Sequence, residues 1–515
     1  MRKPVEWIQA VVGLCFKEEQ EKEKCFSEME KEYLQFSDQV KNRIREIMMT
    51  QFEARDMVYV LSVVVQYMKS RDFQEDLMKN ILKGDFDCYA GSVIGFQCLR
   101  CVEGQYKRKR LLYKKNMTGY DKMLGLNYPY VPMKARNKKR IVIVTGQLLG
   151  LKHSPTLVVL NMAYALQKYM GYEILLFICP CNGELPEGMW YEQYLEMFTK
   201  EWEQKSVKVP YRGTEFQGYQ ISMRPDSPKE YSMMVSLIYA WNPMFVLDAD
   251  TSNPVVGVVN KFTTLVSLTM SIECPISEGE ILVRLGRMDD ETEKEYADSI
   301  NSNQKQLFMK EKFPVIAEMG KRTFTREELG LPENQFLITV VGNHLKIDID
   351  EEFVQVMRRI LEDIPNAAFV VIGNAEEVKE YYEDKVFEGR IYYLGYCEDL
   401  MGVYGILDLY LNPGRMGGGF SGGMALQADI PVVTLPDCDV AYNCGENFVV
   451  QDYVEMIETV KLYAGDRKFY DAKKEAMKKY NEEDKNKKLI QYMEELLSGV
   501  NEIMGENSSE PEIRG

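Results

Sequence analysis

Six glycines and one serine gather in NPGRMGGGFSGGMA, residues 412–425, between an apolar run and the segment PVVTL. Glycine destabilises regular structure by about 0.5–1 kcal/mol relative to alanine, so a cluster of this kind requires a physical reason. Three interpretations compete: a flexible linker, a tight turn that packs a helix on a sheet, or a set of N–H groups that binds an anion where a helix begins. The pattern is neither GxGxxG with a downstream acidic residue nor a Walker A loop, because no GK[ST] occurs here.

The two histidines of the chain occupy equivalent places. His153 follows the strand pattern KKRIVIVTG, and His344 follows FLITVVGN. An imidazole at the end of a strand can transfer a proton or orient a substrate, although a buried core histidine is the ordinary alternative. Lys346 follows His344 by two positions and could bring an ammonium group to a diphosphate leaving group.

A pair of carboxylates, Asp248 and Asp250, ends the strand pattern PMFVLDAD. The spacing matches the DxD motif, which holds a divalent ion on a sugar nucleotide, but short matches arise by chance in an acidic chain. We predict no metal site. Asp248 is expected either to contact an acceptor or transfer a proton, or only to cap its strand.

Two successive α/β units would position these residues. The first has strand patterns at 138–145, 173–179, 243–250 and 261–270, with a helix at 153–171. The second has strand patterns at 336–343, 367–374, 390–396, 407–413 and 431–435, with an amphipathic helix at 349–365. Strands that alternate with helices indicate parallel sheets with right-handed crossovers. The predicted fold class is therefore α/β, with two facing Rossmann-like, doubly wound domains.

The predicted fold also places the glycine cluster. Ligands of doubly wound sheets bind at the carboxyl ends of the strands, in loops that open helices. The cluster follows the strand 407–413 and precedes the helical pattern SGGMALQA, which disfavours a linker. A phosphate site and tight helix packing both remain open.

The domain organisation follows from changes in pattern along the 515 residues. We predict an all-helical module at 1–106, a basic connector at 107–137, Rossmann-like domains at 138–320 and 321–470, and a C-terminal helix and tail at 471–515. Twelve basic residues lie between Lys107 and Arg140. They indicate either a solvated connector or a surface for an anionic membrane or an acidic partner.

Composition excludes several classes of protein. The net charge of −16 argues against nucleic acid as a partner. The apolar runs are shorter than the roughly 20 residues of a membrane span, and no signal peptide is apparent. Eleven scattered cysteines suit a reducing compartment. We therefore expect a cytoplasmic protein.

The second unit resembles the nucleotide-binding half of glycosyltransferases with the GT-B fold. The resemblance runs from REELGLPENQFLITVVGN through RIYYLGY and LDLYLNPGRMGGGFSGGMALQADIPVVTLP to GENFVV. The stretch from Leu411 to Leu435 is most similar to the O-linked N-acetylglucosamine transferase type and its bacterial relatives. HSPT at 153–156 resembles the histidine-bearing loop of the N-terminal half of that type. In all, the resemblance covers roughly residues 138–470.

The resemblance implies a set of site residues. Contacts with the diphosphate would come from Gly418, Gly419, Phe420, Ser421 and Gly422, with His344 nearby. Lys346 would neutralise the leaving group, Tyr396 and its neighbours would line the base, and Asp437 or Asp439 would bind the ribose. This sequence also departs from the type: Phe420 and Gly422 replace threonines, Met424 replaces a glutamate, and Asp429 replaces a glycine.

The first functional hypothesis is a metal-independent glycosyltransferase without a cofactor, which moves a hexosyl or N-acetylhexosaminyl group from a nucleotide-diphosphate donor, expected to be a UDP-sugar. The acceptor would be a protein, a glycan or a lipid-linked molecule. Lys346 and the helix start at Ser421 would stabilise the departing diphosphate, while His153 or Asp248 would act on the acceptor side. The rival is a non-catalytic, glycosyltransferase-like subunit that binds an acceptor or an active partner. A nicotinamide-dependent oxidoreductase is disfavoured, since no strand leads into GxGxxG.

Overall fold

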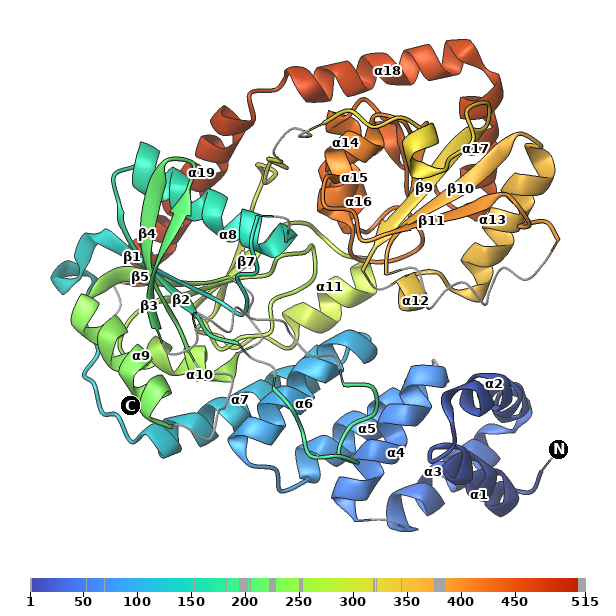
Figure 1. The fold of residues 1–515 in the computed structure, drawn as a ribbon. Helices are drawn as coiled ribbons and strands as arrows, with labels where there is room; N and C mark the ends of the chain where they lie inside the picture. Colours follow the sequence, from blue (N-terminus) through green and yellow to red (C-terminus); the bar gives the residue numbers. More distant parts are fainter. Residues whose placement is uncertain are drawn as a thin grey trace.

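The computed structural model describes residues 2–51, 53–68, 70–151, 153–180, 183–193, 202, 205–221, 228–249, 253–317, 320, 322–343, 345–374 and 385–507. Three bodies make up the molecule: a helical module below, and two α/β domains above it that stand side by side (Figure 1). Each α/β domain is built on one sheet.

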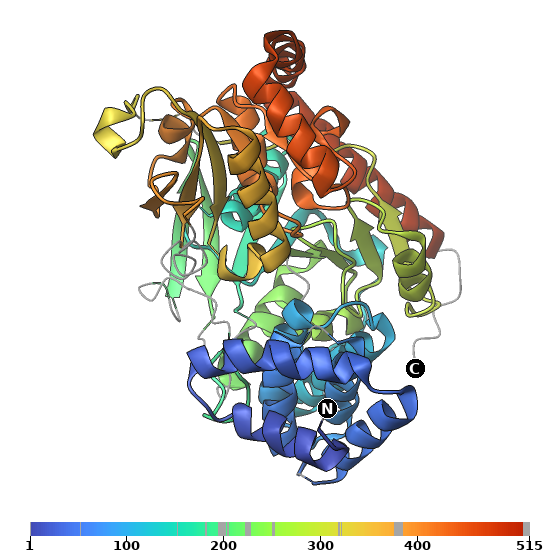
Figure 2. The same cartoon turned by 90° about the vertical axis from the view of Figure 1, so that its right-hand side faces the viewer.

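The helical module consists of α1 (Pro4–Leu14), α2 (Glu19–Gln35), α3 (Asp38–Gln51), α4 (Ala54–Tyr67), α5 (Arg71–Lys83), α6 (Cys88–Cys101) and α7 (Tyr106–Leu124). Apolar side chains at helical spacing, such as Phe73, Leu77 and Ile81 on α5, turn one face of each helix inward. Trp7 of α1 is fully buried and stacks on Phe73 with ring centroids 6.2 Å apart. Figure 2 shows these helices gathered beneath both α/β domains.

Most of the segment predicted as a basic connector is the helix α7. Its side chains Lys109 and Arg110 are buried. Lys109 Nζ donates to the Val102 carbonyl at 2.5 Å, and Arg110 Nη2 lies 3.4 Å from Glu278 of the first α/β domain. Part of the positive charge thus joins the module to that domain instead of facing a membrane or a partner.

The first sheet has eight strands in the order β3-β4-β2-β1-β5-β6-β7-β8. They are β1 (Asn137–Thr145), β2 (Glu173–Ile178), β3 (Lys205–Tyr211), β4 (Thr214–Gln220), β5 (Pro243–Ala249), β6 (Leu265–Leu268), β7 (Ile281–Arg284) and β8 (Lys305–Phe308). β3 pairs antiparallel with β4, and the other neighbours are parallel. The helices are α8 (Ser154–Tyr164), continued by a π-helical turn at Ala165–Tyr169, and α9 (Pro228–Trp241), α10 (Pro254–Gly257) and α11 (Asp290–Ala297).

The second sheet has five parallel strands in the order β11-β10-β9-β12-β13. They are β9 (Phe336–Gly342), β10 (Ala367–Gly373), β11 (Ile391–Gly395), β12 (Leu409–Leu411) and β13 (Val432–Val433). The helices are α12 (Leu345–Asp348), α13 (Glu351–Asp363), α14 (Leu400–Tyr404), α15 (Gly419–Gln427), α16 (Asp439–Cys444), α17 (Tyr453–Gly465) and α18 (Arg467–Glu482). The buried side chains of α13 and α17 pack in one hydrophobic cluster, and those of α14, α15 and α16 pack in another.

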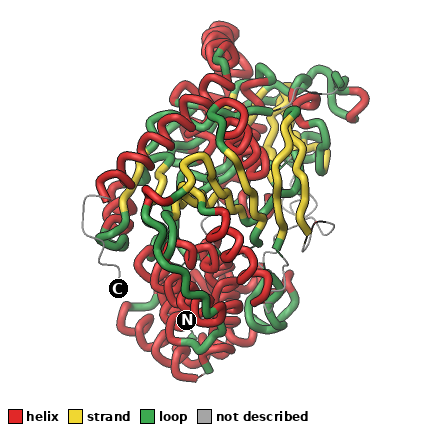
Figure 3. The backbone as a smooth tube through the Cα atoms, turned by 90° about the vertical axis from the view of Figure 1, so that its left-hand side faces the viewer, coloured by secondary structure: helices red, strands yellow, loops and turns green. Residues whose placement is uncertain are grey.

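The last helix, α19 (Lys485–Asn507), returns to the first domain. Figure 1 shows α18 above the second sheet and α19 beside the first. The apolar face of α19, which includes Leu489, Met493 and Leu496, packs in the same hydrophobic core as β1, β2 and α8. Figure 3 shows the strands of both sheets between helical layers. Among the helices of the described residues, none combines the length and the hydropathy that crossing a membrane requires.

Candidate functional site: an interdomain cleft

A cleft of about 2530 Å³ lies where the three bodies meet. Typical small-ligand pockets measure roughly 300–1,000 Å³, so this cleft is larger than a site for one small ligand. Its walls come from the loops after β1 and β6, from the loops after β9, β10 and β12, and from α2, α4 and α6 of the helical module. The carboxyl ends of both sheets therefore face the same space, as expected for doubly wound domains.

The glycine loop and the start of α15 form part of the cleft wall. Gly418, Gly419, Phe420 and Ser421 all line the cleft. Gly418 is the N-cap residue of α15 with φ of +90°, a conformation that glycine adopts without strain. The first bond from the helix to its cap is donated by the N–H of Gly422 to the Gly418 carbonyl at 3.0 Å. The N–H groups of Gly419, Phe420 and Ser421 precede it and are therefore the groups that an anion at this helix start would meet.

The same glycines also bring two helices together. A Cβ on Gly419 would lie 2.8 Å from the Asp439 carbonyl oxygen, and one on Gly422 would lie 2.7 Å from Val440 Cγ1. Gly422 is buried and does not line the cleft. The cluster thus combines the two interpretations that the sequence left open: its first part opens to the cleft, and its second part packs α15 against α16.

Arg415, which the sequence analysis did not single out, fixes the shape of this loop. Its side chain is 7% exposed and forms an ion pair with Asp348 of α12. It also donates to the Val341 carbonyl at 2.6 Å and to Asn412 Oδ1 at 3.1 Å. Burial opposes its charge, but Tyr410 and Asp348 raise the pKa of Arg415 above its ordinary value. Arg415 therefore ties the ends of β9 and β12 to the glycine loop as a permanent cation.

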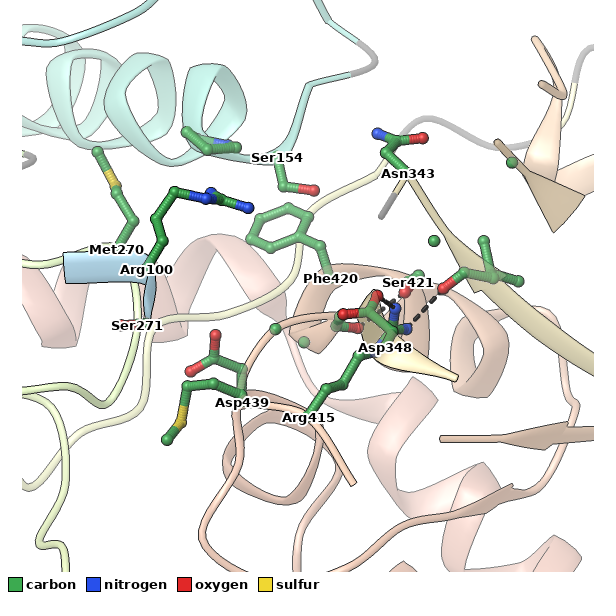
Figure 4. Close-up of a pocket in the computed structure, with 18 of the residues that line it drawn as sticks. Arg100, Ser154, Met270, Ser271, Asn343, Asp348, Arg415, Phe420, Ser421 and Asp439 are labelled. Atoms are coloured by element: carbon green, nitrogen blue, oxygen red, sulfur yellow. Dashed lines mark hydrogen bonds and ion pairs between the residues drawn. The ribbon is translucent and has the colours of Figure 1, made fainter. Parts of the chain in front are cut away.

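A short relay of hydroxyl groups continues from Arg415. Arg415 Nη2 lies 3.3 Å from Tyr410 Oη, which lies 3.0 Å from Ser421 Oγ. Ser421 Oγ donates to the Gly418 carbonyl at 2.8 Å. Since this hydroxyl is bonded within the loop, the group that Ser421 offers to a ligand is its backbone N–H. Figure 4 shows Arg415, Asp348 and Ser421 grouped on one side of the cleft.

His153 lies on the opposite wall, at the N-cap of α8. Its Nδ1 is 3.0 Å from Thr156 Oγ1, which accepts the N–H of Leu149 at 2.8 Å. Burial lowers the pKa of His153 to about 4, so the imidazole is neutral at pH 7. A group with this pKa is a weak base at neutral pH, which favours a role in orienting a substrate over proton abstraction.

Burial of His153 predicts an acid-dependent loss of stability. The unfolded chain takes up a proton near pH 6.5, whereas the folded protein does so only near pH 4. The free energy of unfolding should therefore fall as the pH drops from 6.5 to 4. His153→Gln should remove roughly 2 kcal/mol of that fall, with allowance for partial exposure of the ring. Urea unfolding of both proteins at several pH values measures the free energy of unfolding as a function of pH. If this free energy falls equally in both proteins between pH 6.5 and 4, the lowered pKa of His153 is contradicted.

Asp439 links the two α/β domains. It is the first residue of α16, and its Oδ1 accepts the N–H of Ile272, in the loop after β6, at 3.0 Å. Its own N–H donates to the Met416 carbonyl of the glycine loop at 2.9 Å. Burial raises the pKa of Asp439 to about 7; the Ile272 N–H opposes this rise and the charge of Glu273 adds to it. The carboxyl group lines the cleft and titrates near neutral pH.

Of the other residues that the sequence predicted for the site, some line the cleft and some do not. Tyr396 lines the cleft and is 64% exposed. Asp437 is exposed outside the cleft, with φ of +54°, while Asp439 lies within it. Asp248 is buried and does not line the cleft; its charge raises the pKa of Tyr113 on α7, after the larger effect of burial.

Three predicted positions lie wholly or partly outside what the structure describes. His344 and Asp250 are outside the described residues. Lys346 belongs to α12, but its side chain is not described. Asp348, Ile349 and Asn343 around it line the cleft, so the backbone of Lys346 is beside the cleft. The roles of His344 and Lys346 stay predictions.

Within the described segments of the chain, no group of three or more His, Cys, Asp or Glu side chains is placed to hold a metal ion.

Sequence comparison finds no match for this chain, neither among protein-family models nor among curated proteins. Comparison of structures does find matches. A mutant O-GlcNAc transferase of Thermobaculum terrenum is similar over 99% of both chains, with a TM-score of 0.59 and 11% identity. OtsA in its apo form has a TM-score of 0.49 and 10% identity over 71% of this chain and 99% of its own. Anabaena Alr3699/HepE with UDP and glucose has a TM-score of 0.47 and 12% identity over 70% and 99%.

The match to the Thermobaculum protein includes the helical module as well as both α/β domains, since it covers 99% of each chain. At 11% identity the match bears on the fold alone. Two parallel-sheet domains that face one cleft, preceded by an all-helical region, agree with the architecture that the sequence predicted. The chain has the fold of the GT-B glycosyltransferases.

Proposed function

We propose that this protein is a glycosyltransferase that moves a sugar from a nucleotide-diphosphate donor to an acceptor bound in the same cleft. The observation that carries the proposal is the open start of α15. The N–H groups of Gly419, Phe420 and Ser421 lie at the cleft wall, in a loop that Arg415 holds in place. Backbone donors at a helix N-terminus bind phosphate groups through direct hydrogen bonds and through the helix dipole.

The chemistry of such a site is electrostatic. When the bond between the sugar and the diphosphate breaks, negative charge builds on the departing oxygen, and fixed donors stabilise it without reorganising. Lys346 on α12 is the expected second source of positive charge. The acceptor would approach from the wall that carries His153, whose neutral imidazole can orient a hydroxyl group. We expect a UDP-sugar as the donor, a hexosyl or N-acetylhexosaminyl group as the transferred sugar, and no metal requirement.

The acceptor would enter along the helical module. Side chains of α2, α4 and α6, among them Glu30, Tyr67 and Arg100, form the third wall of the cleft. Figure 4 shows Arg100 on the side of the cleft away from Arg415. A protein, a glycan or a lipid-linked acceptor would meet this wall while the donor occupies the glycine loop.

A specific observation supports the rival hypothesis of a non-catalytic subunit. Phe420 stands where the resembling type has a threonine, and its ring packs against the core of the first domain. In Figure 4 the ring points across the cleft toward Ser154. Met424, in place of a glutamate, also lines the cleft. These side chains remove polar contacts that a nucleotide would use, so a test of nucleotide binding separates the two hypotheses.

The test is thermal unfolding of the purified protein with UDP, GDP, ADP or NAD, with and without Mg²⁺. A ligand at one hundred times its Kd adds about 2.7 kcal/mol to stability. We expect stabilisation by one nucleoside diphosphate, independent of Mg²⁺ and lost in Lys346→Ala. Lys208→Ala is a matched control, because this lysine is 69% exposed on β3 and pairs only with Glu215 among its described neighbours. No stabilisation by any nucleotide would leave the non-catalytic subunit as the better hypothesis.

A further inference from the structure

Asp439 lies directly beside the start of α15. A Cβ built on Gly419 would be 2.9 Å from Asp439 Cβ, so the side chain of Asp439 begins next to the first N–H group of the helix. Figure 4 shows its carboxyl group in the cleft near Ser271. A diphosphate bound to the N–H groups of Gly419 and Phe420 would have this carboxyl group as a neighbour.

The two carboxyl oxygens of Asp439 are in different environments. Oδ1 accepts the N–H of Ile272 at 3.0 Å. Oδ2 accepts no hydrogen bond from the residues that the structure describes, and the carboxyl group lines the cleft. A proton carried on Oδ2 would therefore be available to a ligand in the cleft.

The nearest charged group, Glu273, favours the protonated form of Asp439. Glu273, in the facing loop of the first domain, repels the carboxylate. The first turn of α15, Gly419 to Gly422, carries no titratable side chain. Arg415 in the glycine loop is paired with Asp348, and Tyr442 on α16 itself has a pKa raised to about 12, chiefly by burial, so it stays neutral. Arg100, whose positive charge would oppose this proton, lies on the wall of the cleft away from Arg415.

We propose that the donor site takes up one proton when it binds a nucleotide sugar, and that Asp439 holds this proton and donates it in a hydrogen bond to a phosphate oxygen. This inference rests on the proposed function. A carboxylate next to a diphosphate would be repelled by it, whereas the protonated group converts repulsion into an O–H···O⁻ hydrogen bond. The group is half protonated near neutral pH before any ligand binds.

Calorimetric titration with UDP-glucose, GDP-glucose and ADP-glucose between pH 6 and 8.5 tests the proposal. A sugar-linked diphosphate has no phosphate monoester, the group that titrates near pH 6, so the probe itself does not change charge in this range. Titration in two buffers with different ionisation heats counts the protons. For the sugar that binds, we expect uptake of one proton at pH 8 and a Kd that rises about tenfold per pH unit above pH 7.

Two variants make the test specific. In Asp439→Asn the amide can accept from Ile272 and donate to phosphate, as the protonated acid does. This variant should take up no proton and should bind at pH 8 as tightly as the unchanged protein does at pH 6. Glu273→Gln removes the repelling charge, so the rise in Kd should begin at a lower pH; this variant serves equally if Asp439→Asn fails to fold.

The outcomes separate the inference from the proposed function. A Kd that does not depend on pH, or a pH dependence that survives in Asp439→Asn, would overturn the role of Asp439 while nucleotide binding stands. Absence of binding for all three sugars at every pH would overturn both.

Discussion

Gly373→Ala is expected to lower the free energy of unfolding of the second domain by about 3–5 kcal/mol. Gly373 ends β10 with φ of +118°, which side chains rarely adopt, and its Cβ would lie 1.8 Å from the carbonyl oxygen of Gly342 on β9. Backbone strain of this kind costs about 1–3 kcal/mol, and forcing an extra carbon against fixed backbone costs about 1–3 kcal/mol more. Urea unfolding at pH 7 measures the change.

Gly389→Ala is the matched control for this substitution. Gly389 also has a positive φ, +68°, but its Cβ would meet nothing within 4 Å. Conformational strain alone should cost about 1–2 kcal/mol there. Equal losses in the two variants would show that the contact with Gly342 relaxes, and the close approach of β9 and β10 would then not require glycine.

Arg415→Met should lower the free energy of unfolding by about 3–5 kcal/mol, because it leaves one partner of a largely buried ion pair uncompensated. The variant leaves the carboxylate of Asp348 without Arg415, its ion-pair partner, and removes the hydrogen bonds to the Val341 carbonyl and to Asn412. We also expect loss of stabilisation by nucleotides, since the glycine loop is no longer fixed. Chemical unfolding gives the first quantity, and thermal unfolding with nucleotide gives the second.

The control for Arg415→Met is Arg359→Met on α13. Arg359 is 59% exposed and lies 3.1 Å from Asp363, a pair of the kind that contributes about 0–1 kcal/mol. If Arg415→Met lowers the free energy of unfolding no more than Arg359→Met does, Arg415 does not hold the glycine loop in place as described. Retained nucleotide binding in a destabilised Arg415→Met protein would limit its role to folding.

Most strands were predicted from short apolar runs, but β7 and β8 were not, although β7 is fully buried. β1, β5, β9 and β10 carry runs of apolar residues and were located within a few residues. The hairpin of β3 and β4 was also missed, because its strands lack a continuous apolar run and Pro210 within β3 argues against a strand. Its turn uses Arg212 and Gly213, both at positive φ, instead of the more recognisable Asn-Gly.

The candidate site was only partly predictable, because its decisive contacts are distant in sequence. The glycine loop and His153 follow strands, and their types and positions are visible in the sequence. Arg415 pairs with a residue 67 positions away, and Asp439 meets Ile272 across 167 positions. Such pairings depend on how the two domains face one another, which local patterns do not encode.

One departure from the resembling type is explained by the backbone. Asp429 replaces a glycine and adopts φ of +59°, in the left-handed region. Aspartate tolerates this region better than most residues, and Asn481 donates to Asp429 Oδ1 at 2.9 Å. The turn after α15 is therefore kept without glycine.

The return of α19 to the first domain has a consequence for biosynthesis. The core around β1 and α8 includes Tyr492, Leu496 and Val500, which are synthesised after all elements of the second domain. Domains usually form in order from the N-terminus as the chain is made. Here the first sheet lacks α19 until the second domain has been synthesised, whereas the helices α12 to α18 of the second domain are complete by Glu482. Nascent chains halted before residue 485 should therefore expose apolar surface on the domain that was synthesised earlier, a natural target for chaperones.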